Sequence, residues 1–152
     1  MTILAHRLMR MIETNSQALA ETLEVKLLRS ERCADYSRVS PEEVKTLVGG
    51  IYGHLGEWLV TKTEQDIERR YSTFGARRAE QSVPVSQLVW CIVLVKENLW
   101  DYLRNNEDLE NASQIFGELE LTQMVDEFFD RALYYAVRGH ERVRDARLAA
   151  RM

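Results

Sequence analysis

Eight consecutive apolar residues, LVWCIVLV, occupy positions 88–95 and constrain the fold of this chain more than any other feature. A charged segment precedes them, and Pro84 stands between the two. Proline is favoured at the start of a helix and cannot continue a preceding one, so we expect one helix to end before Pro84 and another to begin there. The new segment, residues 84–104, keeps a helical period for longer than a typical strand. Because the run is apolar on every side, this helix is expected at the centre of the core.

The rest of the sequence also predicts helices. Apolar residues repeat at helical spacing over residues 3–28, with a break expected at Asn15 and Ser16. Ser40, Pro41 and Glu43 indicate a helix start with a serine cap and a capping box, and that helix is expected to run through residue 59. Residues 31–39 and 105–114 read as connections, residues 62–80 as a charged helix, and residues 115–150 as the last helix. The fold class predicted is all-α: a single-domain bundle of about five to seven helices over residues 1–152, of which a globin-like arrangement is one form.

Composition and charge restrict the class of protein. The chain has 152 residues, of which 45% are apolar and 29% charged, as in an ordinary globular domain. A net charge of −4 and a pI near 5.5 give no reason to expect binding to nucleic acid. No apolar run approaches the roughly 18 residues that span a bilayer, and the first residues do not have the pattern of a signal peptide. We therefore expect a cytoplasmic protein with no membrane span and no nucleic-acid partner.

Three glycines, Gly49, Gly53 and Gly56, share one face of the helix expected at residues 41–59. A glycine inside a helix costs about 1 kcal/mol relative to alanine, so three of them call for a structural reason. Close crossing by a neighbouring helix is the explanation that we favour, and room for a ligand between helices is the alternative. His54 lies in the same stretch and raises the question of haem ligation. We expect no cofactor, but His54 with these glycines would be the cofactor-binding residues if one were bound.

No pattern in the sequence indicates catalysis or a metal site. The chain has none of the phosphate-binding, dinucleotide-binding or nucleophile motifs, and no histidine or cysteine spacing typical of metal ligands. Cys91 lies inside the apolar run and is expected to act as a small hydrophobic residue, whereas Cys33 is expected in a loop as the more exposed thiol. Catalytic and metal-binding residues are therefore both expected to be absent, and the protein is not expected to be an enzyme.

The joint at Pro84 and its flanking helices resemble a known family. The pattern runs from Arg70-Tyr71 through Gly75, Arg78 to Gln81 and Pro84 to Trp90, Lys96 and Trp100, and continues in the segments FFDRA and YY…RGHE of the last helix. This pattern resembles the N-terminal sensor domain of RsbRD-type stressosome proteins. Ser82 stands where this family pattern has a glycine before Val-Pro, and His140 stands where an aromatic residue is common. The residues that carry the motif are the candidates for interaction: Arg70, Tyr71, Gly75, Arg78, Gln81, Pro84, Trp90, Lys96 and Trp100.

The resemblance implies a non-enzymatic bacterial signalling domain that responds to a stimulus and regulates a protein partner. It also implies a globin-like helical fold without haem. Arg70, Arg78, Glu80 and Gln81 cluster where two helices change direction, and we expect them either to fix the turn by polar contacts or to be ordinary surface residues. Two other functions stay open: a helical sensor that binds a small ligand or haem, and an accessory subunit of a larger complex. The length of the last helix predicts a homodimer with residues 115–150 at the interface.

Overall fold

The computed structural model describes the backbone of residues 1–106 and 112–152, and the side chains of residues 1–105 and 118–152. Its elements in chain order are α1 (Ile3–Thr14), α2 (Ser16–Arg29), the 3₁₀ segment η1 (Glu31–Arg38), α3 (Pro41–Tyr52), the π-helical turn η2 (Glu57–Thr61), α4 (Glu64–Glu80), α5 (Val85–Asn106) and α6 (Ala112–Ala150). The predicted all-α single-domain bundle is confirmed. Within the described ranges, no helix combines the length and the apolar character needed to cross a membrane.

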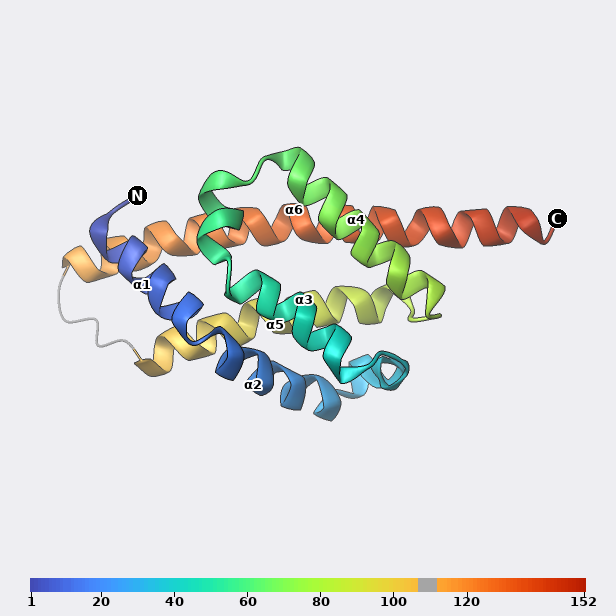
Figure 1. Cartoon of the computed structure of the whole chain (residues 1–152), viewed down its shortest axis with the longest axis horizontal. Coiled ribbons are helices and arrows are strands. Elements are labelled where there is room, and N and C mark those ends of the chain that lie inside the picture. The colour runs from blue at the N-terminus through green and yellow to red at the C-terminus, as the bar shows by residue number, and fades with distance from the viewer. Residues whose placement is uncertain (107–111) are drawn as a thin grey trace.

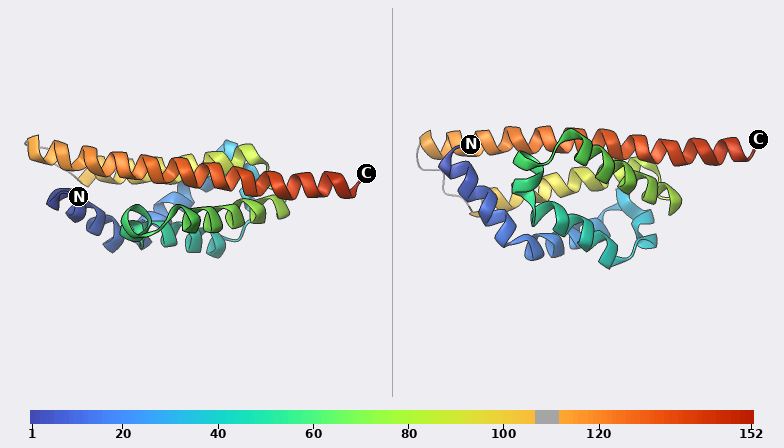
Figure 2. Two further views of the ribbon diagram at one scale, coloured as in Figure 1. Left: turned by 90° about the horizontal axis from the view of Figure 1, so that it is seen from above. Right: turned by 45° about the horizontal axis from the view of Figure 1, so that its top comes forward.

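The helix α6 extends along one whole side of the bundle (Figure 1). It packs mainly against α4 and also contacts α1 and α5, while α5 packs against α2, η1 and α6. With 39 residues, α6 is about 58 Å long, which exceeds the roughly 30 Å diameter of a small domain. It continues through Gly139 as one helix, and its C-terminal turns project beyond the other helices (Figure 2).

Side-chain caps define several helix ends. Asn15 separates α1 from α2, as expected, and its side-chain amide donates a hydrogen bond of 2.8 Å to the carbonyl of Met11. Ser40 caps α3 by accepting a hydrogen bond from the backbone N–H of Glu43. A complete capping box, which the sequence analysis did not identify, begins α4 and is formed by Thr63 and Asp66. The caps at Ser40 and Thr63 satisfy backbone N–H groups that the first helical turn leaves without partners, whereas Asn15 satisfies a carbonyl of the last turn of α1.

The apolar helix α5 lies in the core, but it is not buried on every side. The residues of α5 that are buried are Leu88, Cys91, Ile92, Val95, Asn98, Leu99 and Leu103. Val89, which the pattern places in the core, is half-buried, as are Trp90, Val93 and Leu94. The side-chain amide of Asn98 donates to the carbonyl of Leu19 at 3.0 Å, so it links α5 to α2 inside the core.

Two segments differ from the expectation. Residues 31–39 were expected to be a connection, but Glu31–Arg38 is a 3₁₀ helix that carries the buried side chains of Cys33 and Tyr36. Such short helices lack the length over which an apolar period can be recognised. The helix expected from residue 41 to residue 59 ends at Tyr52, with Gly53 as its C-cap, and the chain then turns into η2. The apolar period continues across this interruption, which is why the sequence alone did not reveal it.

A close helix crossing joins α4 to α6 through Gly75 and Gly139. A Cβ atom on Gly75 would lie 1.8 Å from the carbonyl oxygen of Ala136, and one on Gly139 would lie 2.0 Å from the carbonyl oxygen of Ser72. Each glycine thus lies directly against the backbone of the facing helix, and no side chain fits between them. This crossing fixes the distance between α4 and α6.

The crossing predicts opposite effects for two glycine-to-alanine changes. Gly75→Ala should destabilise the fold by about 2 kcal/mol, because the added methyl group must push α4 and α6 apart. Gly49→Ala is the matched control: it also lies inside a helix, but a Cβ there would have nothing within 4 Å. This change should stabilise the fold by up to about 1 kcal/mol through helix propensity alone. Urea unfolding of the two variants checks both values, and equal effects would contradict the close crossing.

Candidate functional site

The joint, defined as residues 79–84, turns the chain from α4 into α5. The backbone N–H of Val83 donates to the carbonyl of Arg78 at 2.9 Å, and the N–H of Ser82 donates to the carbonyl of Ala79 at 3.0 Å. This pair of bonds is the Schellman motif, in which the residue after the helix adopts a left-handed conformation and is usually glycine. Ser82 occupies that position with φ of 61°. The departure from the family pattern at Ser82 therefore falls on the position of the joint that requires a left-handed backbone.

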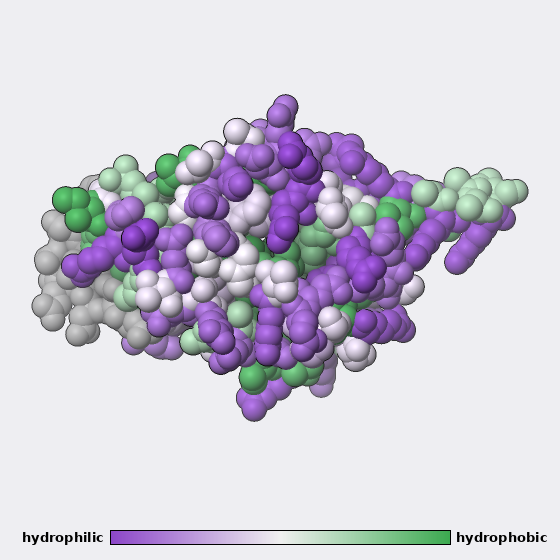
Figure 3. All heavy atoms as spheres, viewed as in Figure 1, coloured by the Kyte–Doolittle hydropathy of each residue, from purple (hydrophilic) through white to green (hydrophobic). Residues whose placement is uncertain are grey.

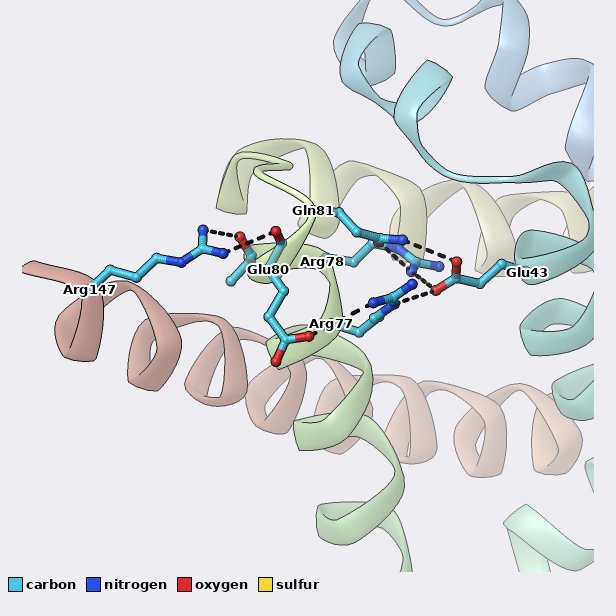
Figure 4. A network of polar contacts seen from close by, with 7 residues as sticks. Glu43, Arg77, Arg78, Glu80, Gln81 and Arg147 are labelled. Atoms are coloured by element: carbon cyan, nitrogen blue, oxygen red, sulfur yellow. Dashed lines mark hydrogen bonds and ion pairs between the residues drawn. The ribbon is translucent and has the colours of Figure 1, made fainter.

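A buried arginine organises the joint. Arg78 is only 1% exposed, and its Nη1 donates to Glu43 Oε1 at 2.9 Å and to Gln81 Oε1 at 3.0 Å. The amide of Gln81 in turn donates to Glu43 Oε2 at 3.0 Å, and Arg77 Nε donates to Glu43 Oε1 at 3.2 Å (Figure 4). We call these four residues the joint network. The guanidinium also lies 4.7 Å from the centre of the Phe74 ring, and its Nε is buried without a hydrogen-bond partner.

The carboxylate of Glu43 supplies the negative charge of this network. Burial by itself raises the pKa of Glu43, but the hydrogen bonds from Arg77, Arg78 and Gln81 outweigh it and hold the pKa below its ordinary value. Glu43 is therefore ionised at neutral pH and balances the charge of the buried guanidinium. Because Glu43 lies at the start of α3, the network joins α3 to the end of α4.

Helix α6 holds the other side of the joint. Arg147 donates to the carbonyls of Ala79 at 2.8 Å and Glu80 at 3.0 Å, which receive no hydrogen bond from a residue four positions later because α4 ends there (Figure 4). His140 is 5% exposed, and its Nε2 lies 2.7 Å from the carbonyl oxygen of Val83. From η1, Arg38 donates to the carbonyl of Ser82 at 3.0 Å. The joint thus receives contacts from η1, α3 and α6.

The interaction candidates from the sequence fall into separate places. Arg78, Gln81 and Pro84 lie at the joint and Gly75 lies at the crossing, whereas Arg70 is exposed two turns earlier on α4 and does not fix the turn. The remaining four lie elsewhere in the bundle. Tyr71 is buried against Trp58 and Phe128, Trp90 is stacked by Arg32 at 4.2 Å, Lys96 lies 3.4 Å from Asp126, and Trp100 is half-buried.

Two essential members of the site were not identified as such from the sequence. Glu43 was assigned to a capping box, but its side chain binds Arg77, Arg78 and Gln81, although its backbone N–H does receive the serine cap. Arg147 is one of several arginines in a charged helical segment, and no pattern distinguishes it from its neighbours. Both contacts join residues far apart in the chain, and local periodicity carries no information about such pairs.

His54 and Gly49 line one open depression between α3 and α4, whereas Gly53 and Gly56 lie at helix contacts. His54 has 62% of its side-chain surface exposed and lies 3.6 Å from Glu57. Gly53 lies near Ser16 and Gly56 lies against Met9, so these two glycines allow α1 and α2 to approach. Gly49 has no neighbour that a Cβ would meet, and the helix crossing expected at this face does not include it.

The titratable groups give no sign of a metal centre or reactive thiol. The described residues contain no group of three or more histidine, cysteine, aspartate or glutamate side chains that could hold a metal ion. Cys33, expected to be exposed, is 3% exposed, and burial together with the nearby Cys91 raises its pKa to about 11. Burial likewise raises the pKa of Cys91. Both thiols are protonated at neutral pH and are therefore poor nucleophiles.

Comparison with known proteins identifies the family. The model of the RsbT co-antagonist protein rsbRD N-terminal domain matches residues 17–152. The chain belongs to this family. The resemblance found in the sequence is thereby confirmed, and the match includes every element from α3 to α6 while α1 (Ile3–Thr14) lies outside it. No curated protein and no solved structure matches the chain.

The left-handed backbone at Ser82 gives a first prediction for the site. Ser82→Gly should stabilise the protein by about 0.5–1 kcal/mol, because glycine adopts this conformation without the clash of a Cβ atom. Ser86→Gly is the control, since Ser86 is also exposed but lies in the first turn of α5. That change should destabilise by about 0.5 kcal/mol. Thermal and urea unfolding of both variants test the assignment, and a loss of stability in Ser82→Gly would contradict it.

The charge of Glu43 gives a second prediction. Glu43→Gln should cost about 2 kcal/mol at pH 7, because the buried guanidinium of Arg78 loses its charged partner. Folding lowers the pKa of Glu43, so this contribution is present above about pH 4.3 and disappears as the pH falls through the lower pKa of the folded state. The difference between wild type and variant should therefore shrink in acid. Glu42→Gln, at the neighbouring exposed position, should change stability by less than about 0.5 kcal/mol at either pH.

Proposed function

We propose that this chain is a non-enzymatic regulatory input domain whose packing state is read by a protein partner. Its family is named for co-antagonists of RsbT, and we extend to this chain the general role of acting on a signalling protein. The absence of a catalytic motif from the sequence agrees with regulation through contacts. We further propose that it acts in the cytoplasm, as one domain over residues 1–152.

The observation that carries this proposal is the attachment of α6 to the joint. Arg147 binds the two carbonyls at the end of α4, and the crossing at Gly75 and Gly139 brings the same two helices into backbone contact. A change in the joint must therefore either move α6 or break the bonds from Arg147. Since the C-terminal turns of α6 project beyond the bundle, a partner can contact them without disturbing the core (Figure 2). Signal transfer by a shift between two helix packings is an established kind of switch.

Partner capture with a joint variant tests the function. Affinity-tagged protein would be expressed in the cells that naturally make it, and bound proteins identified by mass spectrometry. We expect a discrete partner whose recovery falls at least about threefold in Arg147→Ala, because the variant releases α6 from the joint. Arg142→Ala is the control, since Arg142 is exposed on the same helix. Failure to recover any partner, or equal recovery with both variants, would count against the proposal.

We also propose that the protein forms a homodimer through α6. Tyr134 and Leu148 are large apolar side chains of α6 that are 54% and 52% exposed. The double change Tyr134→Glu and Leu148→Glu should convert a dimer to a monomer in sedimentation equilibrium at tens of micromolar. Val25→Glu, at an exposed apolar position on α2, should leave the dimer intact. A monomeric wild-type protein would overturn this proposal, and the proposal of partner regulation would stand.

A further inference from the structure

A groove lies between α3 and α4 and consists of two adjoining depressions of about 380 Å³ and 540 Å³. Both have Thr46 and Arg70 in their walls, so they are continuous. Near the middle of the face shown in Figure 3, hydrophobic residues are recessed between hydrophilic ones. Each depression has the volume of a small-molecule site, for which about 300–1,000 Å³ is typical.

One end of the groove is cationic. The larger depression is lined by Lys45, Lys62 and Arg70, and the carboxylate in its lining is that of Glu57, which lies beside His54. Lys45 is 3.4 Å from Glu24, and Lys62 lies over the ring of Trp58. Arg70 makes no hydrogen bond or ion pair with any residue that the structure describes. Its guanidinium is therefore free to bind an anion, and its planar shape suits a carboxylate or a phosphate.

The backbone of two glycines forms the bottom of the cationic end of the groove. Gly49 and Gly50 line it, and a Cβ on Gly49 would meet nothing within 4 Å, while one on Gly50 would meet only Arg70 Nη2 at 3.5 Å. The other glycines that the structure describes lie at close contacts, but these two cost helix stability without a close contact to any described residue. Their effect is to keep the groove open next to Arg70.

The other end of the groove is apolar and reaches the joint network. Leu47 and Phe74 line it, together with Glu43, Arg77 and Arg78. Arg78 is 99% buried, and its Nε has no hydrogen-bond partner among the residues that the structure describes. A molecule with an anionic group near Arg70 would thus place its apolar body on Leu47 and Phe74, beside the residues that hold the joint.

We infer that this groove binds a small organic anion, whose carboxylate or phosphate is held by Arg70, Lys45 and Lys62. Its apolar body lies on Leu47 and Phe74. Occupation brings the ligand into contact with Phe74, whose ring packs against the guanidinium of Arg78. The binding site stands on the geometry of the groove alone. The role of the bound anion as the stimulus of the domain rests on the regulatory function proposed above, because Arg78 links the groove to the joint and Arg147 links the joint to α6.

Binding can be followed at a single side chain. Trp58 lines the groove, and its indole N–H donates to the carbonyl of Gly50 at 3.2 Å, whereas Trp90 and Trp100 line neither depression. The ¹⁵N-labelled chain would be titrated with 4-phenylbutyrate and, separately, phenyl phosphate, to distinguish the two head groups. The indole resonance of Trp58 should shift saturably, with Kd of about 1 mM or below, while those of Trp90 and Trp100 stay in place. The uncharged 4-phenylbutanamide and inorganic phosphate should each bind at least tenfold more weakly.

Three variants test whether the anion binds in this groove. Arg70→Ala should weaken binding at least tenfold, and Arg69→Ala, which alters an exposed arginine outside the groove, should leave Kd unchanged. Thr46→Trp should abolish binding by filling the groove, with its melting temperature checked to establish that it folds. Equal binding by Arg70→Ala and Arg69→Ala, or no saturable shift up to about 20 mM of either anion, would overturn the inference. Binding as strong for the amide as for 4-phenylbutyrate would also overturn it.

The role as a stimulus is tested separately. Partner capture would be repeated with and without saturating anion, in wild type and in Thr46→Trp. A change in recovery by at least about threefold in wild type alone supports the stimulus. Binding without any change in recovery would remove that role and leave the binding site established. If no partner is recovered under any condition, the proposed function is wrong. The titration still tests whether the groove binds an anion.

Discussion

The charge of Arg78 determines how the two halves of the chain meet. A guanidinium that is 1% exposed has lost most of its hydration, and its burial is tolerated only with an opposite charge and hydrogen-bond acceptors close by. Glu43 provides the charge and Gln81 an acceptor, which forces the start of α3 to lie beside the end of α4. Because α4 ends at this point, the carbonyls of Ala79 and Glu80 lack their usual helical donors and accept hydrogen bonds from Arg147. The position of α6 at the joint therefore follows from the neutralisation of one buried side chain.

The helical fold was predictable because its signals are local. The serine cap at Ser40, the break at Asn15 and the apolar period of α5 each depend on residues within one or two turns, and the structure has all three. The errors occurred where tertiary contacts override local pattern. Residues 31–38 are helical because they pack on α5: the backbone N–H of Asp35 donates to Gln87 Oε1, and Gln87 Nε2 donates to Asp35 Oδ2. Cys33 is buried for the same reason.

The candidate site was only partly predictable. Arg78 and Gln81 were recognised from the clustering of polar residues before Pro84, but the same reasoning included Arg70, which points to a groove instead. The glycines show most clearly the limit of prediction from the sequence. Gly49 attracted notice because it belongs to a regular pattern, yet it has open space around it, whereas Gly75 and Gly139 hold two helices together from positions 64 residues apart. A sequence can show that a glycine is unusual for a helix, but the facing backbone is what explains it.

The continuity of α6 through Gly139 makes it a lever. The fulcrum is the contact between Gly139 and the backbone of Ser72, and the arm runs from there, through the contact of Arg147 with the joint, to Ala150. That arm spans about eleven residues, or roughly 16 Å at the rise of an α-helix. A tilt of about 10° at the crossing would displace its tip by about 3 Å, since a helix is stiff over such a length. Shifts of less than about 1 Å close to the crossing therefore produce a displacement of about one atomic diameter at the C-terminal end of α6.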